Sequence, residues 1–166
     1  TITTNSASKT YSVTGWRVGW AIALDESITT AIRRIHDFLS IGAAAPLQEA
    51  IAKAMSMPKP YYTELAAGYQ ARRDSILSTL RNAGFECVTP QAAYYVMARY
   101  PDCGHDDDLA FAYFLAEEIG VTPVPGRAFY HDPSLAKSYV RFAFPKKLQT
   151  LDQVRVRMAR LQEFRN

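Results

Sequence analysis

The sequence predicts an α/β protein, because stretches with apolar residues at helical spacing alternate with short apolar stretches typical of strands. After residue 58 this alternation is long enough to build an α/β core of its own. Before residue 58 it provides only two strands and two helical pieces, which is too little for a domain. We therefore expect residues 1–57 to be the remnant of a larger domain and residues 58–166 to form a smaller, C-terminal domain.

The first 57 residues begin with the two strands. Residues 1–5 are β-prone, and Val18–Leu24 is a short apolar run of the kind found in buried strands. Asp25 precedes a helix, since carboxylates are favourable at a helix N-terminus and apolar residues recur after it at helical spacing. The recurring residues are Ile28, Ile32, Ile35 and Leu39. A second helical piece covers about 47–56. Because the chain starts with Thr1 inside a β-prone segment, we expect it to be a piece of a longer protein.

The stretch "MPKP" (Met57–Pro60) marks the boundary between the two parts, because proline disrupts the interior of a helix. A long helix follows and ends near Asn82, with Gly84 as its C-terminal cap. The elements expected after it are strands within 85–90 and 92–100, a helix over 106–119, strands within 121–126 and 138–144, and a final helix. Thr150 and Gln153 have the spacing of a capping box at the start of that final helix.

The composition is that of an ordinary soluble globular protein, with 48% hydrophobic and 21% charged residues among 166. The net charge is only +3 and the basic residues are scattered, which argues against nucleic acid as a partner. No apolar run has the length of a membrane span, so no membrane partner is expected. Cys87 and Cys103 lack the spacing of a zinc site or a disulfide framework. We expect a cytoplasmic protein with reduced cysteines.

The stretch "SASKTYSVTGWRVGWAIA" (Ser6–Ala23) places Lys9 eight residues before Arg17, with Gly15 and Gly19 close by. A lysine with a lowered pKa forms an imine with a carbonyl group, and the planar fork of arginine matches the geometry of phosphate. A ligand with both an aldehyde and a phosphate, such as pyridoxal 5′-phosphate (PLP), would explain both cations. The residues alone leave a second explanation open, in which Lys9 is a solvated loop lysine and Arg17 pairs with a surface acid.

This stretch closely resembles the PLP-lysine motif of the class I/II aminotransferases, which have fold type I. In that motif a serine precedes the imine-forming lysine by three residues, and an arginine that binds the cofactor phosphate follows it by eight. The resemblance therefore implies that Lys9 is the catalytic lysine and that Ser6, Lys9 and Arg17 bind the cofactor. It also implies a homodimer and amino-acid and 2-oxo-acid substrates.

The resemblance continues to the end of the chain. "PQAAYYVMARY" (90–100) is similar to the family's Pro-x-Gly-x-Tyr segment, and "PVPGRAFY" (123–130) to its Pro-Gly-x-x-Phe loop. "SYVRFAF" (138–144) resembles the strand whose arginine binds the substrate α-carboxylate, which falls on Arg141. Within the family, the sequence as a whole most resembles the group of kynurenine–oxoglutarate, glutamine and methionine transaminases. Ala92 departs from the pattern, because the family usually has glycine there.

The resemblance covers the C-terminal half of the family only. The groups that the family's N-terminal half provides, including the aspartate that pairs with the cofactor ring nitrogen, have no counterpart here. We therefore expect an aminotransferase whose isolated 166-residue chain is inactive. Two alternatives stay open: a PLP-dependent lyase or synthase of the same fold, such as a C–S lyase, and a non-catalytic, truncated binding module.

Several other residues have simpler explanations. For Arg141, an ion pair with an acidic residue is the structural alternative to a carboxylate site. Tyr94 and Tyr95 alternate across a strand, so one should face the core and the other an edge or cleft. The acids of "HDDD" (105–108) are explained by the helix dipole, and no metal site is expected. Loop residues Arg127 and Phe129 are expected to pack rather than to bind ligands.

Overall fold

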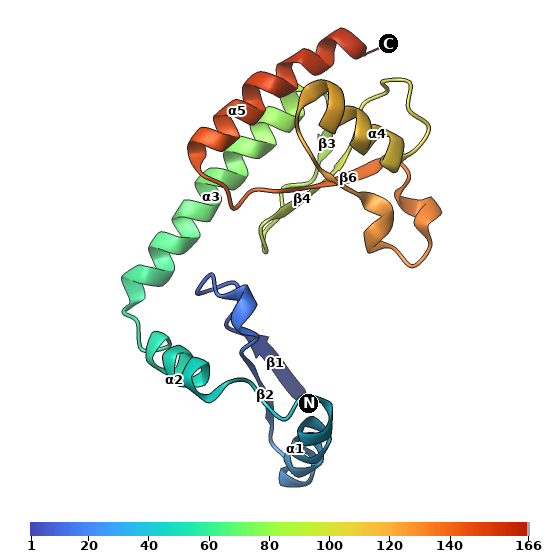
Figure 1. The fold of residues 1–166 in the computed structure, drawn as a ribbon. Coiled ribbons are helices and arrows are strands. Elements are labelled where there is room, and N and C mark those ends of the chain that lie inside the picture. The colour runs from blue at the N-terminus through green and yellow to red at the C-terminus, as the bar shows by residue number, and fades with distance from the viewer. Residues whose placement is uncertain (166) are drawn as a thin grey trace. The chain divides into compact units, whose positions relative to one another are not determined.

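The computed structural model describes residues 1–165 and shows the predicted mixture of helices and strands (Figure 1). The chain divides into two compact units, Thr1–Tyr61 and a second that begins at Tyr62. This division lies four residues after the boundary expected from "MPKP". None of the helices within residues 1–165 is both long and apolar enough to cross a lipid bilayer.

The first unit contains one antiparallel hairpin and two helices. Its elements are β1 (Ile2–Ser6), a 3₁₀ turn η1 (Thr14–Trp16), β2 (Gly19–Ala23), α1 (Glu26–Leu39) and α2 (Ala45–Ala54). The Asp25 side chain accepts a hydrogen bond from the Ser27 backbone N–H at 2.8 Å, which confirms the predicted start of α1.

The prediction that β2 is a buried strand is wrong for the described chain. Ile22 is 55% exposed and Leu24, just after the strand, is 99% exposed. The apolar stripe of α1 is also largely exposed, including Ile35 and Leu39. The buried residues of this unit form a small cluster of Ala7, Val18 and Ile51 instead. The first unit therefore presents an extensive apolar surface on both its sheet and its first helix.

The second unit is a four-stranded antiparallel sheet with helices packed on one face. Its elements are α3 (Lys59–Asn82, which starts in the first unit), β3 (Glu86–Cys87), β4 (Tyr95–Arg99), α4 (Asp108–Phe114), a π-helical turn η2 (Leu115–Ile119), β5 (Val124–Pro125), 3₁₀ turns η3 (Gly126–Phe129) and η4 (Pro133–Ala136), β6 (Tyr139–Ala143), α5 (Leu148–Ala159) and a 3₁₀ turn η5 (Arg160–Phe164). The strand order is β3-β4-β6-β5. In Figure 1, α5 runs alongside α3, and the Gln162 amide donates to the Asn82 carbonyl at 2.9 Å.

Alternation along β4 and β6 creates two different faces of this sheet. Val96, Ala98, Val140 and Phe142 are buried and contribute to one hydrophobic core with the helices. The intervening residues, among them Met97 and Arg141, which pair across the strands, lie on the opposite and more open face. The sheet therefore carries a cation on the face that the helices do not cover.

One local prediction about a helix end needs correction. The final helix begins at Leu148 with Lys147 as its N-cap, so Thr150 lies inside the first turn and no capping box forms. Pro60 lies within the first turn of α3, where its missing N–H is no loss. Gly84 has φ of +93°, as expected for the residue that follows a helix.

Candidate active site

The loop that carries Lys9 and Arg17 is closed at its base by the β1–β2 hairpin. Ser6 pairs with Gly19 at the end of the ladder, and the Ala7 N–H donates to the Val18 carbonyl at 3.1 Å. A Cβ on Gly19 would lie 2.6 Å from the Asn5 carbonyl oxygen, so this close pairing requires glycine. The ten residues between Ala7 and Val18 therefore leave and rejoin the sheet at one point.

Packing fixes the rest of this loop. Ala7 and Val18 are buried against Ile51 of α2, which anchors both ends of the loop. At its far side, the Tyr61 hydroxyl donates to the Thr10 carbonyl at 2.6 Å. The rings of Tyr11 and Tyr61 are stacked, with centroids 6.0 Å apart. The loop is thus held at its base and at its middle.

Lys9 and Arg17 meet at one residue, Thr14. The Lys9 Nζ is 3.5 Å from the Thr14 Oγ1, and the Arg17 guanidinium donates to the Thr14 carbonyl at 3.1 Å. The Thr14 hydroxyl in turn donates to the Ser8 carbonyl at 3.3 Å. The hairpin and the η1 turn therefore bring the two cations together, although eight positions separate them in the sequence.

The backbone of Arg17 is unusual. Its φ is +58°, in the left-handed region, which costs roughly 1–2 kcal/mol for a residue other than glycine. Such conformations cluster at ligand sites, where the surrounding structure enforces them. Arg17 also lines a hollow of about 700 Å³ whose wall carries Arg33 and His36. A second arginine in the wall of the same hollow makes this surface suitable for an anion.

Ser6 lies at the entrance to the same loop. Its hydroxyl donates to the Ser8 Oγ at 2.7 Å and accepts the Ser8 N–H at 3.1 Å. One loop therefore presents an amine, a guanidinium and a hydroxyl. This donor set fits a ligand that has both an aldehyde and a phosphate, since the amine suits the aldehyde and the other groups suit the phosphate.

The other predicted site residue, Arg141, lies in the second unit on the open face of the sheet. Its guanidinium carbon is 4.1 Å from the centroid of the Tyr95 ring and 3.9 Å from that of the Phe129 ring. The Arg141 Nε is buried and has no hydrogen-bond partner within residues 1–165. No acidic side chain of the described residues forms an ion pair with it, so the ion pair considered as an alternative is not formed within residues 1–165.

This environment restricts what Arg141 is able to bind. Two aromatic rings cover the guanidinium carbon, so the edge of the group is the part left for hydrogen bonding. An edge with an unpaired buried N–H suits a planar, bidentate anion such as a carboxylate. The prediction for the two tyrosines is consistent with this arrangement: Tyr95 contacts Arg141, whereas Tyr94 packs against the core and stacks on Tyr69.

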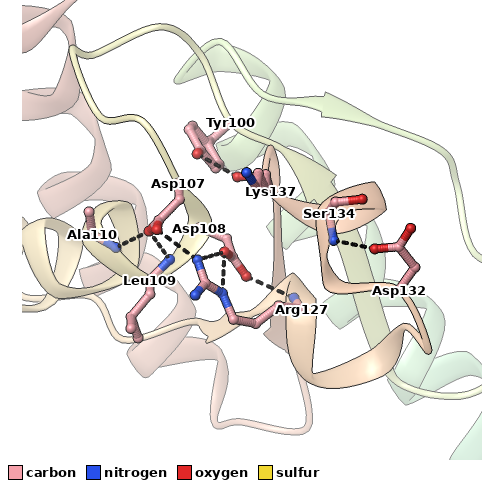
Figure 2. Close-up of polar contacts among 9 residues, drawn as sticks. All are labelled: Tyr100, Asp107, Asp108, Leu109, Ala110, Arg127, Asp132, Ser134 and Lys137. Atoms are coloured by element: carbon pink, nitrogen blue, oxygen red, sulfur yellow. Dashed lines mark hydrogen bonds and ion pairs between the residues drawn. The ribbon is translucent and has the colours of Figure 1, made fainter.

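The η3 turn that carries Phe129 is joined to α4 by a cluster of charges (Figure 2). Asp108, whose side chain is fully buried, accepts from the Arg127 backbone N–H at 2.7 Å and from its Nε at 2.6 Å. Asp107 caps α4 and contacts the Arg127 guanidinium at 2.8 Å. These hydrogen bonds, chiefly the one to Asp108, raise the pKa of Arg127 above its usual range, so it stays charged.

Tyr100 borders this cluster and donates its hydroxyl to the Lys137 carbonyl at 2.7 Å (Figure 2). Burial, followed by the nearby Asp108 and Asp107 charges, raises the pKa of Tyr100 to about 12, so it remains a phenol. The acids of "HDDD" therefore do more than favour the helix dipole, which the sequence analysis missed. Within residues 1–165, no group of three or more His, Cys, Asp and Glu side chains has the arrangement of a metal site.

Comparisons with known proteins give the same assignment throughout the chain. The sequence profile of the family described as "Aminotransferase class I and II" matches residues 1–157. The kynurenine–oxoglutarate transaminase of Dictyostelium discoideum is 36% identical over 98% of this chain and 42% of its own length. The methionine aminotransferase of Escherichia coli (strain K12) is 31% identical over 90% of this chain and 38% of its own length.

A solved structure agrees with these sequence matches. N-succinyldiaminopimelate aminotransferase from Mycobacterium tuberculosis has a TM-score of 0.87 and 32% identity, over 96% of this chain and 41% of that one. The chain thus spans about two fifths of the length of the relatives it matches. Because the family profile covers most of the sequence and the fold agrees, this chain belongs to the class I and II aminotransferases, a family of PLP-dependent enzymes.

Proposed function

We propose that the complete gene product is a PLP-dependent aminotransferase that moves an amino group from an amino acid to a 2-oxo acid. The observation that carries this proposal is the convergence of Lys9 and Arg17 on Thr14, within a loop that has the family's motif. That arrangement places a nucleophilic amine beside a phosphate-binding fork.

Lys9 is proposed as the residue that holds the cofactor aldehyde and then carries a proton. When bound, PLP supplies an electron sink for the carbanion at the substrate Cα. With PLP and substrate bound, the Lys9 amine would be the base that moves a proton at the substrate Cα. Thr14 orients the Lys9 Nζ through its hydroxyl, 3.5 Å away.

Arg17 and Ser6 are proposed to hold the phosphate. The guanidinium offers parallel N–H donors, and the Ser6 hydroxyl would add one more donor by turning away from the Ser8 Oγ, to which it donates in this structure. The direction of the Arg17 guanidinium is fixed by its hydrogen bond to the Thr14 carbonyl and by the left-handed backbone conformation of Arg17. Phosphate binding at this place would position the aldehyde end of the cofactor in reach of Lys9.

Arg141 is proposed to bind the substrate α-carboxylate. Its buried, unpaired Nε and its aromatic neighbours favour a planar anion at the edge of the guanidinium. A carboxylate there would pair the orphaned N–H and orient the amino acid for reaction. The relatives' names point to kynurenine, methionine and N-succinyldiaminopimelate as examples of the substrate class.

The first unit is proposed to be the last part of a larger PLP-binding domain, and the second to be the small domain. The exposed apolar stripe on β2 and α1 supports this, because other polypeptide would have to cover such a surface in a stable enzyme. The greater length of the relatives supports it as well. By the family resemblance the protein is proposed to be a homodimer, and by the expectation of reduced cysteines it is proposed to be cytoplasmic.

A transamination assay of the complete gene product tests the proposed function. The PLP-loaded protein should convert an amino acid and 2-oxoglutarate into a new 2-oxo acid and glutamate, and Lys9→Ala should abolish this conversion. Release of ammonia or a thiol without any need for an amino acceptor would contradict the proposal and favour a lyase of the same fold. Failure of the protein to bind PLP would favour a non-catalytic module.

A further inference from the structure

The position of Arg141 depends on Phe129 because the guanidinium has few polar anchors. Its Nε is buried without a partner within residues 1–165, and two aromatic rings provide its close contacts. Tyr95 belongs to β4, which is paired with β6 in the same sheet, so its place is fixed by the ladder. Phe129 lies outside the sheet at the end of the η3 turn, and its place depends on what holds that turn.

Two features on opposite sides hold the η3 turn. On one side, a Cβ on Gly126 would lie 2.5 Å from the Tyr139 carbonyl oxygen, so the turn is in close contact with the start of β6. On the other side, both carboxylate oxygens of Asp108 bind Arg127, one at the backbone N–H and one at the side chain (Figure 2). The turn is therefore fixed two residues before Phe129.

Asp108 is unusual among the acids of this segment. It is fully buried, whereas the Asp107 side chain is 38% exposed. A buried carboxylate is costly unless it is paired, and Arg127 supplies the hydrogen bonds of both Asp108 oxygens. Because one of these bonds goes to the backbone, the pair fixes the path of the chain as well as a side chain.

We propose that Asp108 is a positioning residue for carboxylate binding, which acts by clamping Arg127 so that Phe129 holds the Arg141 guanidinium in place. This inference rests on the proposed role of Arg141. The clamp and the carboxylate site are linked by one short path: Asp108 to Arg127, along the turn to Phe129, and from its ring to Arg141.

Asp108→Asn is the substitution that tests the clamp. It keeps the size of the side chain, but in either orientation its amide presents an NH₂ group to one of the two Arg127 donors, so one hydrogen bond is lost. Asp106→Asn is the matched control, because it removes the same charge two residues away. Asp106 forms no hydrogen bond or ion pair with Arg127 in the described part of the chain.

The first measurement does not depend on activity. In the complete gene product, the backbone amides of residues 124–130 should exchange with D₂O faster in Asp108→Asn than in the wild type or in Asp106→Asn. Equal exchange in all three proteins would overturn the clamp, because the turn would then be held as firmly without the full pair of Asp108 hydrogen bonds.

The second measurement connects the clamp to carboxylate binding. We expect Asp108→Asn to raise KM for the amino acid about two- to thirtyfold, the effect of displacing an aromatic neighbour from a desolvated cation, with kcat and PLP occupancy nearly unchanged. In an Arg141→Lys background the same substitution should have no further effect on KM. A purely structural role would give the same increase in both backgrounds and would overturn the inference.

The two proposals fail in different ways. If Arg141→Lys raises KM but Asp108→Asn does not, the positioning role of Asp108 is wrong and the carboxylate site stands. If Arg141→Lys alone leaves KM unchanged, the proposed carboxylate site is wrong, and the role of Asp108 in substrate binding is wrong with it.

Discussion

The guanidinium carbon of Arg141 lies 3.9 Å from the centroid of the Phe129 ring, although Arg141 belongs to β6 and Phe129 to the η3 turn. This contact places a cation on the open face of the sheet without an acidic partner among the described residues. A cation in such a position is available to an anionic ligand, and its orientation is set largely by apolar neighbours.

Phe129→Leu should weaken substrate binding. A leucine keeps apolar contact but lacks the negative ring face, which is worth about 0.5–2 kcal/mol to a partly desolvated cation. We expect KM for the amino acid to rise a few-fold in the complete gene product while PLP binding stays the same. Tyr130→Leu, at the next and partly exposed residue, is the matched control and should leave KM unchanged. Equal effects in the two variants would contradict a specific role for the Phe129 ring.

Arg141→Ala should have a larger effect than any change to its neighbours. Removing one partner of a buried, bidentate charge pair costs roughly 2–5 kcal/mol, so kcat/KM should fall at least thirtyfold. Arg99→Ala removes an exposed arginine from the neighbouring strand and serves as the control. If Arg141→Ala instead lost PLP while the kinetics per bound cofactor stayed normal, Arg141 would be a cofactor or structural residue.

The turn before β4 carries a testable strain at Ala93. Its φ is +59°, a conformation that costs a residue with a Cβ roughly 1–2 kcal/mol but that glycine adopts freely. Ala93→Gly should therefore raise the free energy of unfolding by about 0.5–1 kcal/mol, after the greater flexibility of glycine in the unfolded chain is subtracted. Ala92→Gly, although it restores the family's usual glycine, should lower it. Urea unfolding of both variants shows at which of the two positions glycine stabilises the folded protein.

Acid should weaken the junction between α4 and the η3 turn. Hydrogen bonds, first from the Ala110 N–H and then from Arg127, lower the pKa of Asp107 below its ordinary value of 3.8. A carboxyl group with a depressed folded-state pKa contributes stability that is complete above the unfolded-state pKa and is lost as the pH falls through the folded-state pKa.

Asp107→Ala should therefore be less stable than the wild type at pH 7, by an amount that stays constant down to about pH 5 and shrinks below about pH 4. Thermal unfolding at a series of pH values measures this difference, with Asp106→Ala as the control. A difference that grew on acidification would show that the sign of the Asp107 contribution is wrong.

Features that depend on local chemistry were predictable from the sequence. Asp25 caps α1 as its carboxylate suggested, and Gly84 takes the left-handed conformation that ends a helix. The strands expected within 92–100 and 138–144 correspond to β4 and β6. In each case the determining interaction lies within a few residues or follows the strand period.

Features that depend on tertiary contacts were not predictable in the same way. Asp108 and Arg127 are 19 residues apart, and nothing local indicates which of several acids the turn would bring to the arginine. The capping box at Thr150 failed because the helix already begins at Leu148, with Lys147 as its N-cap. The burial of β2 was predicted from its apolar sequence, but burial depends on what covers a strand, and the described chain leaves it exposed.

The lysine that binds the cofactor is identified by chemical trapping. The complete gene product should be incubated with PLP, reduced with borohydride, digested and analysed by peptide mass spectrometry. We expect a pyridoxyl adduct on Lys9, and no adduct at that peptide in Lys9→Ala. An adduct on Lys53 or Lys137 with Lys9 unmodified would show that Lys9 is not the cofactor lysine.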